Sequence, residues 1–477
     1  MTPSELSAPR HVHAYLRADT SGPRTIFTPP LRATSIGLLI VITLIAFEAM
    51  AVSAALPTAA RALSGLGAFG WAFTGFLVAN VVGMVASGQL SDSRGPRTPL
   101  VAGIACFVAG LVLSGTATTM AQLVAGRVVQ GLGSGLIIVA IYVVIGQAYP
   151  ERLRPSVFAA TSSAWVLPAL VGPGVAGALA EHASWRWVFL GLVPFVALGA
   201  ALLGPVLRSL HPAHEKTRLA APSRLLRALG VAAGIAALEQ AGQHPSVLSG
   251  VLGLAGLGSL AWGIRPLLPV GTLRVRRGVG APIALRGLLA GAFFGIESVV
   301  PLSLSVQHGY SPTLAALPLT CAGFSWTAGS WVQSRADDAA GPSARIRLMR
   351  TGFVLVAAAG VLMALAAMPN LPGWPAFLAW VLAGLGAGLT MSSASVLMLK
   401  YTTDADRGAD SAALQLSDAT ASALTTGIAG VLIAAAARGA ISHTAGFVLL
   451  DVLMCAIALV GALVAGRARP AENATSG

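Results

Sequence analysis

Apolar segments long enough to cross a lipid bilayer follow one another along nearly the whole chain. A helix that crosses the hydrocarbon core needs about 20 apolar residues. We expect fourteen such spans, at 34–56, 70–90, 99–117, 121–146, 157–180, 186–207, 225–241, 246–264, 283–306, 312–332, 349–368, 373–399, 411–436 and 442–465. Charged residues make up only 10% of the chain, whereas a soluble domain carries roughly 25%. The sequence therefore predicts an all-α membrane protein.

Lysine and arginine are distributed unevenly between the two sides of the predicted spans. With a cytoplasmic amino terminus, 26 of the 30 basic residues, Arg286 among them, fall on the cytoplasmic side. Basic residues favour that side of a membrane. We expect a multi-pass protein of the plasma (inner) membrane with both termini in the cytoplasm. The formal net charge of +13 then faces anionic lipid headgroups, which argues against a nucleic-acid partner.

Two longer basic connections, 208–224 and 265–282, flank the seventh and eighth spans. The seventh span is the weakest, because it is short and holds Glu239. Two bundles with a substrate path between them are a common plan of transporters built from repeats. The expected organisation is a cytoplasmic tail at 1–33, a six-helix bundle at 34–207, an inserted two-helix hairpin with its basic connections at 208–282, a second six-helix bundle at 283–466 and a cytoplasmic tail at 467–477.

The connection between the second and third spans runs from Gly88 to Arg97 and also holds Asp92 and Gly95. The two glycines permit tight packing and a sharp turn. Asp92 lies just before the third span, and a carboxylate favours the amino end of a helix. An ordinary cytoplasmic turn with charged residues is the alternative interpretation.

The fourth span contains Arg127, a costly residue in an apolar helix and by default a functional one. Gln130 lies three residues further, on the same helix face. Gly131 and Gly135 have the GxxxG spacing that lets a neighbouring helix approach closely. The alternative is that Arg127 reaches toward the membrane boundary and has no functional role.

The fifth span contains Gly172, Pro173 and Gly177. The proline removes one hydrogen bond within the helix, and the glycines thin the helix. A kinked, closely packed helix suits a part that rocks or seals, although a kink without a moving role is the alternative.

These three stretches resemble the major facilitator superfamily, and within it the fourteen-span drug:proton antiporter group. The family's loop motif is matched at Gly88, Leu90, Asp92, Gly95 and Arg97, its fourth-span pattern at Arg127, Gln130 and Gly131, and its antiporter motif at Gly172, Pro173 and Gly177. Glu48 precedes Ala55-Leu56-Pro57, where the group tends to carry an aspartate. The resemblance implies two six-helix bundles with two extra transmembrane helices, and alternating access driven by inward proton flow.

Five acidic residues fall within the predicted spans: Glu48, Glu239, Glu297, Asp418 and Asp451. Hydrocarbon disfavours the ionised form of a carboxyl group, so such a group can take a proton from one side and release it to the other. We expect Glu48 and Glu297, in the first spans of the two bundles, to face the cavity and to couple protons with Arg127 and Asp418. Structural pairing of these acids is the alternative.

Polar and aromatic residues of the spans could line a substrate cavity, and the candidates are Gln130, Trp165, Gln307, Trp326 and Gln415. Packing is the commoner role of such tryptophans. We find no phosphate-binding GxxxxGK[ST] motif, no nucleophile–base set and no metal-ligand pattern, so we expect no enzyme activity, no cofactor and no metal. The cysteines lie in apolar runs and do not indicate a disulfide framework.

The sequence therefore predicts a secondary transporter that exports lipophilic, cationic small molecules in exchange for protons. We expect it to act as a monomer. The alternatives are a lipid or metabolite transporter of the same fold, and a membrane scaffold or sensor that does not transport.

Overall fold

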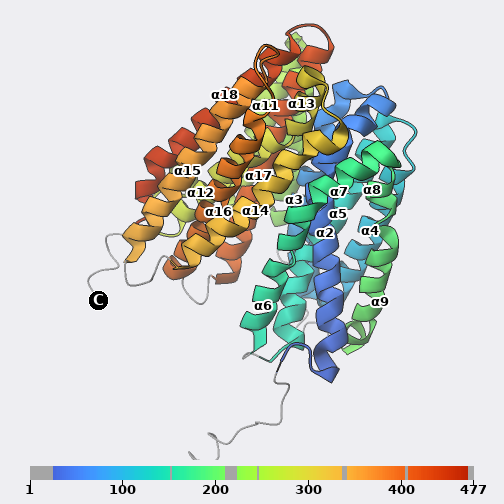
Figure 1. The fold of residues 1–477 in the computed structure, drawn as a ribbon. Coiled ribbons are helices and arrows are strands. Elements are labelled where there is room, and N and C mark those ends of the chain that lie inside the picture. The colour runs from blue at the N-terminus through green and yellow to red at the C-terminus, as the bar shows by residue number, and fades with distance from the viewer. Residues whose placement is uncertain are drawn as a thin grey trace, which may run out of the picture.

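The computed structural model describes residues 25–150, 153–209, 223–243, 246–335, 341–402 and 407–470, and every regular element in these ranges is a helix. In the first half, α3 and α4 pack against α5, and α2 packs against α7 and α9 (Figure 1). The helices of this half are α2 (Pro29–Ala62), α3 (Phe69–Arg94), α4 (Arg97–Gly115), α5 (Met120–Ala148), α6 (Arg154–Ser163), α7 (Val166–His182), α8 (Trp187–Leu190) and α9 (Val193–Ser209).

The second half repeats this kind of packing with α15 and α14 against α16, and α12 against α17 and α18. Its helices are α12 (Gly280–Glu297), α13 (Val300–His308), α14 (Pro312–Arg335), α15 (Gly341–Ala366), α16 (Pro375–Tyr401), α17 (Arg407–Ala437) and α18 (His443–Val464). Short 3-10 turns cover Leu66–Ala68 (η1), Arg265–Leu267 (η3), Thr272–Arg274 (η4) and Ala465–Arg467 (η6).

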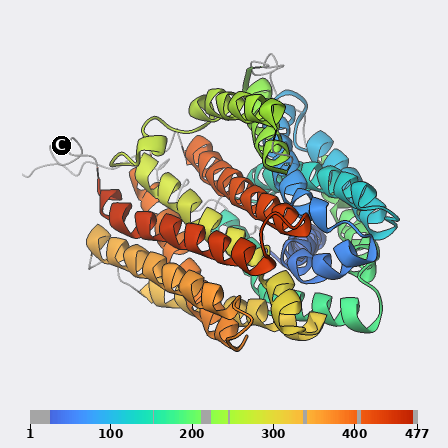
Figure 2. The same ribbon diagram turned by 90° about the horizontal axis from the view of Figure 1, so that it is seen from above.

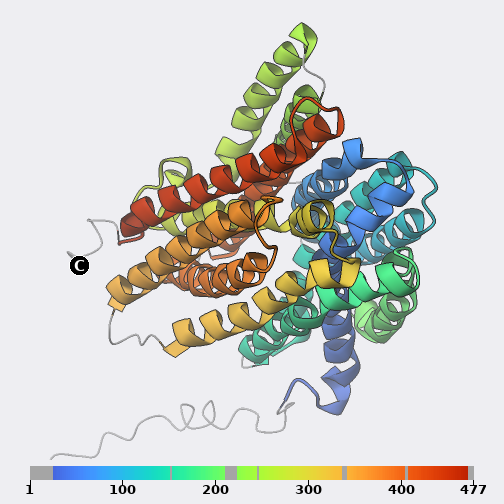
Figure 3. The ribbon, with the colours of Figure 1, turned by 45° about the horizontal axis from the view of Figure 1, so that its top comes forward.

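A hairpin of α10 (Ser223–Gln243) and α11 (Val247–Ile264) joins the halves and lies at the edge of the bundle (Figure 2). Helix α10 packs against both α3 and α17, whereas α11 packs against α10 and the adjoining turn η3. The hairpin protrudes from the rest of the molecule (Figure 3). Val247 and Leu254 are 90% and 72% exposed, as expected for a helix whose outer side contacts lipid.

Twelve helices of the described chain are long and apolar enough to cross a membrane, and they coincide with twelve of the fourteen predicted spans. The seventh predicted span is among them, as Ser223–Gly242. The span expected at 157–180 is divided into α6 and α7, since the helix breaks at Ala164 and Trp165. The span at 312–332 forms the continuous helix α14 but is not among the twelve. The count of fourteen therefore stays a prediction.

Two of these helical segments differ in detail from the predicted spans. Helix α2 begins at Pro29, five residues before the expected start, because a proline in the first helical turn loses no hydrogen bond that the helix needs. The ninth predicted span is present within Gly280–His308, and it consists of α12 followed by α13, with an interruption at Ser298 and Val299 just before Pro301. The break follows Glu297, so this acid lies at the carboxyl end of α12.

The two halves contact one another chiefly through two helix pairs, α7 with α14 and α3 with α17, and α2 also contacts α13 and α14. A Cβ on Gly177 would lie 2.7 Å from the Pro312 carbonyl oxygen, and a Cβ on Gly430 would lie 2.7 Å from the Gly70 Cα. These contacts lie near the ends of the helices remote from the beginning of α2, and the ribbons diverge from there (Figure 1). With the predicted topology, the closed end faces outward, and we call these two pairs the outer contacts.

Candidate functional site

An ion pair between Glu48 of α2 and Arg127 of α5 lies inside the first half. Glu48 is 0% exposed and Arg127 is 2% exposed. Glu297 is also enclosed, with 7% exposure. Both acids are enclosed in this arrangement of the halves, and the expectation that they face the cavity stays a prediction. Truncating one partner of such a pair strands a buried charge, at a cost of about 3–5 kcal/mol.

Arg127 is attached to the backbone of α3 as well as to Glu48. Its Nε donates to the Ala72 carbonyl oxygen at 3.0 Å, and its Nη1 lies 3.4 Å from Gln130 Oε1. The guanidinium also lies over the ring of Phe76, 4.2 Å from the centroid, where a cation is attracted by the π face. Arg127 thus links α2, α3 and its own helix α5 at one point.

Glycines of α5 bring α3 close enough for these bonds. A Cβ on Gly131 would lie 2.8 Å from the Phe76 Cα, and a Cβ on Gly135 would lie 2.8 Å from the Met84 backbone nitrogen. Real Cβ atoms do not come so close, so the crossing requires glycine at both positions. The close approach predicted from the GxxxG spacing is present, and α3 is the helix that it admits.

A second ion pair, Arg286 with Asp418, lies in the second half and is less enclosed. Arg286 Nε is 2.7 Å from Asp418 Oδ2, and the two side chains are 19% and 16% exposed. The same guanidinium donates to the Ser395 hydroxyl and lies 3.4 Å from Gln415 Oε1. We call Arg286, Ser395, Gln415 and Asp418 the polar cluster.

The polar cluster includes a residue that sequence reasoning misplaced. Arg286 was counted among the basic residues of a cytoplasmic connection, but it lies within α12. Its position inside an apolar run was the signal that could have identified it, since an arginine there needs a partner. Tyr142 of α5 is 51% exposed, and the charge of Arg286 acts on it electrostatically.

The remaining cavity candidates do not converge on one site. Gln307 donates to the Thr444 hydroxyl at 2.9 Å, which ties α13 to α18 within the second half. Trp326 packs edge to face with Phe293, at 5.3 Å between ring centroids. Trp165 is 38% exposed at the break between α6 and α7. Gln130 is fully buried beside Arg127.

The motif between α3 and α4 is only partly as expected. Gly95 has φ +79°, a conformation that favours glycine, and it forms the sharp turn. The expected packing role of Gly88 is wrong, because a Cβ there would meet no atom within 4 Å. Asp92 belongs to the last turn of α3 rather than to the start of α4, and its side chain lies outside the described residues. Arg97 is exposed at the first position of α4.

The glycines around Pro173 face different neighbours. A Cβ on Gly172 would make an ordinary contact with α2, at 3.5 Å from the Met50 Cβ. Gly177 faces the start of α14 in an outer contact, where a Cβ would be too close to Thr313 and Pro312. The predicted close packing of this helix is therefore present at Gly177.

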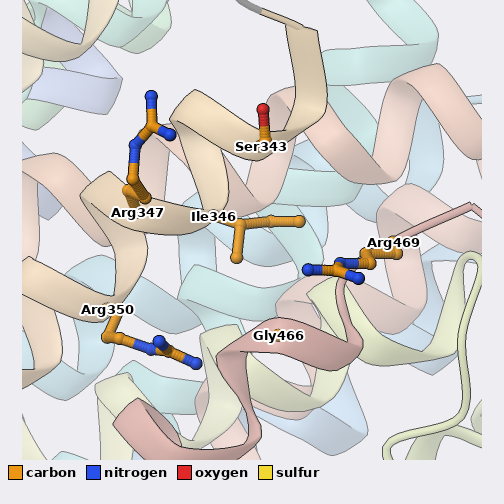
Figure 4. A pocket seen from close by; sticks show the side chains of 6 residues that line it. All are labelled: Ser343, Ile346, Arg347, Arg350, Gly466 and Arg469. Atoms are coloured by element: carbon orange, nitrogen blue, oxygen red, sulfur yellow. The ribbon is translucent and has the colours of Figure 1, made fainter.

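A basic pocket lies at the end of the second half where α18 finishes. It has a volume of about 260 Å³ and is lined by Ser343, Ile346, Arg347, Arg350, Gly466 and Arg469. The guanidinium groups of Arg350 and Arg469 extend from opposite sides toward Gly466, while Arg347 points away from them (Figure 4). The pocket contains none of the predicted site residues.

A bundle of membrane-length helices with ion pairs in its interior has the architecture of a transmembrane transporter. Residues 38–368 match the model of the Major Facilitator Superfamily, so the chain belongs to this superfamily of transporters. It is thus a multi-pass membrane protein of a family of transporters, which is not a class of enzymes.

Several curated transporters are similar in sequence. MFS transporter L2 of Phoma sp. is 33% identical over 36% of this chain and 29% of that protein. MFS efflux transporter aclA of Aspergillus oryzae is 36% identical over 33% of this chain and 28% of that protein. The chain thus matches less than a third of the length of either relative. Efflux pump FUS6 of Gibberella fujikuroi is 25% identical over 76% of this chain and 68% of that protein.

Solved structures of transporters share the fold. An auto-inhibited POT family peptide transporter superposes with a TM-score of 0.64 over 93% of this chain and 99% of that chain, at 16% identity. A POT family transporter in complex with 5-aminolevulinic acid gives a TM-score of 0.63 over 91% of this chain and 96% of that chain, at 14% identity. At these identities the likeness establishes the fold alone.

Proposed function

We propose that this chain is a proton-coupled antiporter that exports lipophilic, cationic small molecules by alternating access. It acts as a monomer with fourteen spans in the plasma membrane, and both termini are cytoplasmic. The names of two similar proteins, an efflux transporter and an efflux pump, support export. The antiporter-like pattern at Gly172, Pro173 and Gly177 supports exchange with protons.

One observation carries the proposal, namely the bond from Arg127 to the Ala72 carbonyl oxygen. Ala72 belongs to α3, and α3 is the helix of the first half that packs against α17 of the second. A change at the enclosed Glu48–Arg127 pair therefore acts on a helix that forms an outer contact. This arrangement supports coupling between proton binding and movement of the halves.

Proton binding to Glu48 removes one charge from the pair and leaves the Arg127 cation without a counter-charge. An uncompensated buried charge is strongly unfavourable. The protonated state therefore favours an arrangement in which Arg127 gains water or another anionic partner. Because Arg127 also binds α3, this rearrangement shifts α3 relative to α17. Release of the proton restores the pair and the closed outer contact.

The polar cluster is the proposed place for the substrate. It is partly exposed, and Asp418 offers a carboxylate to a cation. A cationic substrate that binds Asp418 competes with Arg286 for the carboxylate. The aromatic pair of Trp326 and Phe293 supplies an apolar surface in the same half.

Everted membrane vesicles test the proposal. Addition of a fluorescent lipophilic cation to energised vesicles should collapse the pH gradient when the chain is present. Coupling between two ligands typically amounts to ~5–150-fold, so we expect Glu48→Gln to reduce this response by about tenfold or more. The matched control is Asp451→Asn, which removes another enclosed carboxylate, on α18 and away from both outer contacts.

A correctly inserted chain that gives no response to a broad panel of cations contradicts export of this substrate class. Wild-type coupling in Glu48→Gln contradicts the role of the ion pair. Lipid flux without cation flux would instead identify the chain as a lipid transporter.

A further inference from the structure

Glu239 of the hairpin lies where the two halves cross. Helix α10 packs against α3 of the first half and α17 of the second. A Cβ on Gly70 of α3 would lie 2.9 Å from Glu239 Oε1, and a Cβ on Gly430 of α17 would lie at the same distance. Glu239 is 2% exposed. A single enclosed carboxyl group therefore touches both helices of this outer contact.

Glycines of α3 and α17 surround the Glu239 carboxyl group at this crossing. Gly70 and Gly430 are so close that a side chain on either would displace the other helix. Gly427 lies one turn away from Gly430, and a Cβ there would be 3.6 Å from the Thr74 hydroxyl and 3.8 Å from Glu239 Oε2. Glycines thus leave the space that the Glu239 carboxyl occupies.

The same turn of α3 is joined to the proposed coupling site. Ala72, which accepts the hydrogen bond from Arg127, stands between Gly70 and Thr74 in the sequence. Glu239 contacts α3 beside these two flanking residues. The Glu48–Arg127 pair and Glu239 therefore act on one turn of one helix.

Other titratable groups on the neighbouring elements are remote from Glu239 along their helices. Asp418 precedes Gly430 by twelve residues, and Arg227 precedes Glu239 by twelve, or about 18 Å at the helical rise. Helix α11 and turn η1 carry no titratable residue. The others on the packed elements are Asp92 and Arg94 at the opposite end of α3, Arg407 and Asp410 of α17, Arg224 of α10 and Arg265 of η3. His244 follows α10 and lies outside the described residues.

We propose that Glu239 is a proton-binding site of the α3–α17 contact, protonated while the contact is closed and deprotonated to the outer solution when it opens. Enclosure between glycine backbones strips an ionised carboxylate of its hydration, so the proton-bound form fits the closed contact. Opening exposes the group to water, and the proton passes from the carboxyl to a water molecule. The inference rests on the proposed function, because it assumes that the two halves move relative to one another.

Distances between spin labels test this site without any transport measurement. Labels at Ala62→Cys on α2 and Ala440→Cys after α17 report on the two sides of the contact, in a background without Cys106, Cys321 and Cys455. In lipid nanodiscs between pH 5 and pH 9, we expect the ratio of open to closed molecules to rise with pH. A single proton bound only in the closed state allows a change of up to about tenfold per pH unit.

Glu239→Gln keeps the shape of the side chain without the charge, so we expect that its ratio of open to closed molecules no longer rises with pH. Asp451→Asn is the matched control and should respond to pH like the wild type. His244→Gln should also respond, which separates the carboxyl from the histidine. Gly430→Ala places a methyl group against Gly70 and should open the contact at every pH. This variant shows that the labels detect opening even if Glu239→Gln folds poorly.

If a folded Glu239→Gln protein keeps the pH response of the wild type, the inference is overturned. It is also overturned if His244→Gln abolishes the pH response. The proposed function fails by a different result, the absence of proton-coupled transport in vesicles. A protein that shows no coupled transport but retains a Glu239-dependent contact would keep this inference and lose the proposed function.

Discussion

At the scale of single residues, Arg127 is held by more groups than its charge requires. Glu48 balances the charge, while the Ala72 carbonyl and the face of Phe76 bind the same guanidinium. A lysine could balance Glu48 but could not offer several planar donors at once. The arginine therefore keeps its hold on α3 whether or not Glu48 carries a proton. The Glu48–Arg127 pair therefore has two separate roles, one in stability and one in coupling.

A double-mutant cycle distinguishes these two roles. We expect Arg127→Gln and Glu48→Gln each to lower the free energy of unfolding in detergent by about 3–5 kcal/mol, since each strands the other group. The double variant should lose much less than the sum of the two, because no buried charge remains. Proton-coupled transport should be lost in all three proteins. Stability losses that add within about 0.5 kcal/mol would mean that the two residues do not interact.

At the scale of helices, local sequence patterns predicted close helix packing better than they predicted which side chains form ion pairs. The spacing of Gly131 and Gly135 is a local signal, and the close contact with α3 follows from it. The pairing of Arg286 with Asp418 joins residues 132 positions apart, and no local pattern contains that information. The count of basic residues on each side of the membrane placed Arg286 in a cytoplasmic connection rather than within a helix. The break between α6 and α7 was also missed, because hydropathy alone does not show where a helix is interrupted.

The glycines of α5 give a test at this scale. Gly135→Ala should destabilise the protein by about 1–3 kcal/mol, because the new methyl group meets the backbone of α3 near Met84. Gly146→Ala on the same helix is the matched control, since a Cβ there meets no atom within 4 Å. It should be neutral, or stabilise by the ~0.5–1 kcal/mol that alanine gains over glycine in a helix. Thermal unfolding in detergent measures both, and equal losses would refute the role of the α3–α5 contact.

At the scale of the whole molecule, the two halves meet at two outer contacts of different chemistry. The α3–α17 contact is lined by glycines around an enclosed carboxyl group. The α7–α14 contact carries an exposed acid, Glu181, whose Oε2 accepts a hydrogen bond from the Thr313 backbone N–H at 3.0 Å. Hydrogen bonding from Thr313, and secondarily from Ser311, lowers the pKa of the Glu181 carboxyl. Given the proposed role of Glu239, we expect the two contacts to respond to pH in opposite directions.

The α7–α14 contact should loosen in acid. A carboxyl group whose pKa is lower in the folded contact than in the free side chain stabilises that contact fully at a pH above 4.5, the ordinary pKa of glutamate. This stabilisation is lost as the pH falls through the lowered pKa of the folded state. Spin labels at Ala183→Cys and Leu314→Cys should become more mobile below about pH 4.5. Glu181→Gln should remove this dependence. A pH response that survives in Glu181→Gln would assign it to another group.

The attachment of α3 on both of its sides has a thermodynamic consequence. If the Glu48–Arg127 pair and Glu239 bias the position of the same helix, their equilibria are linked, and linkage is reciprocal. Whatever factor a proton at Glu239 applies to the proton affinity of Glu48, a proton at Glu48 must apply to Glu239. A titration that follows either carboxyl would then report on the occupancy of the other, although α3 stands between them.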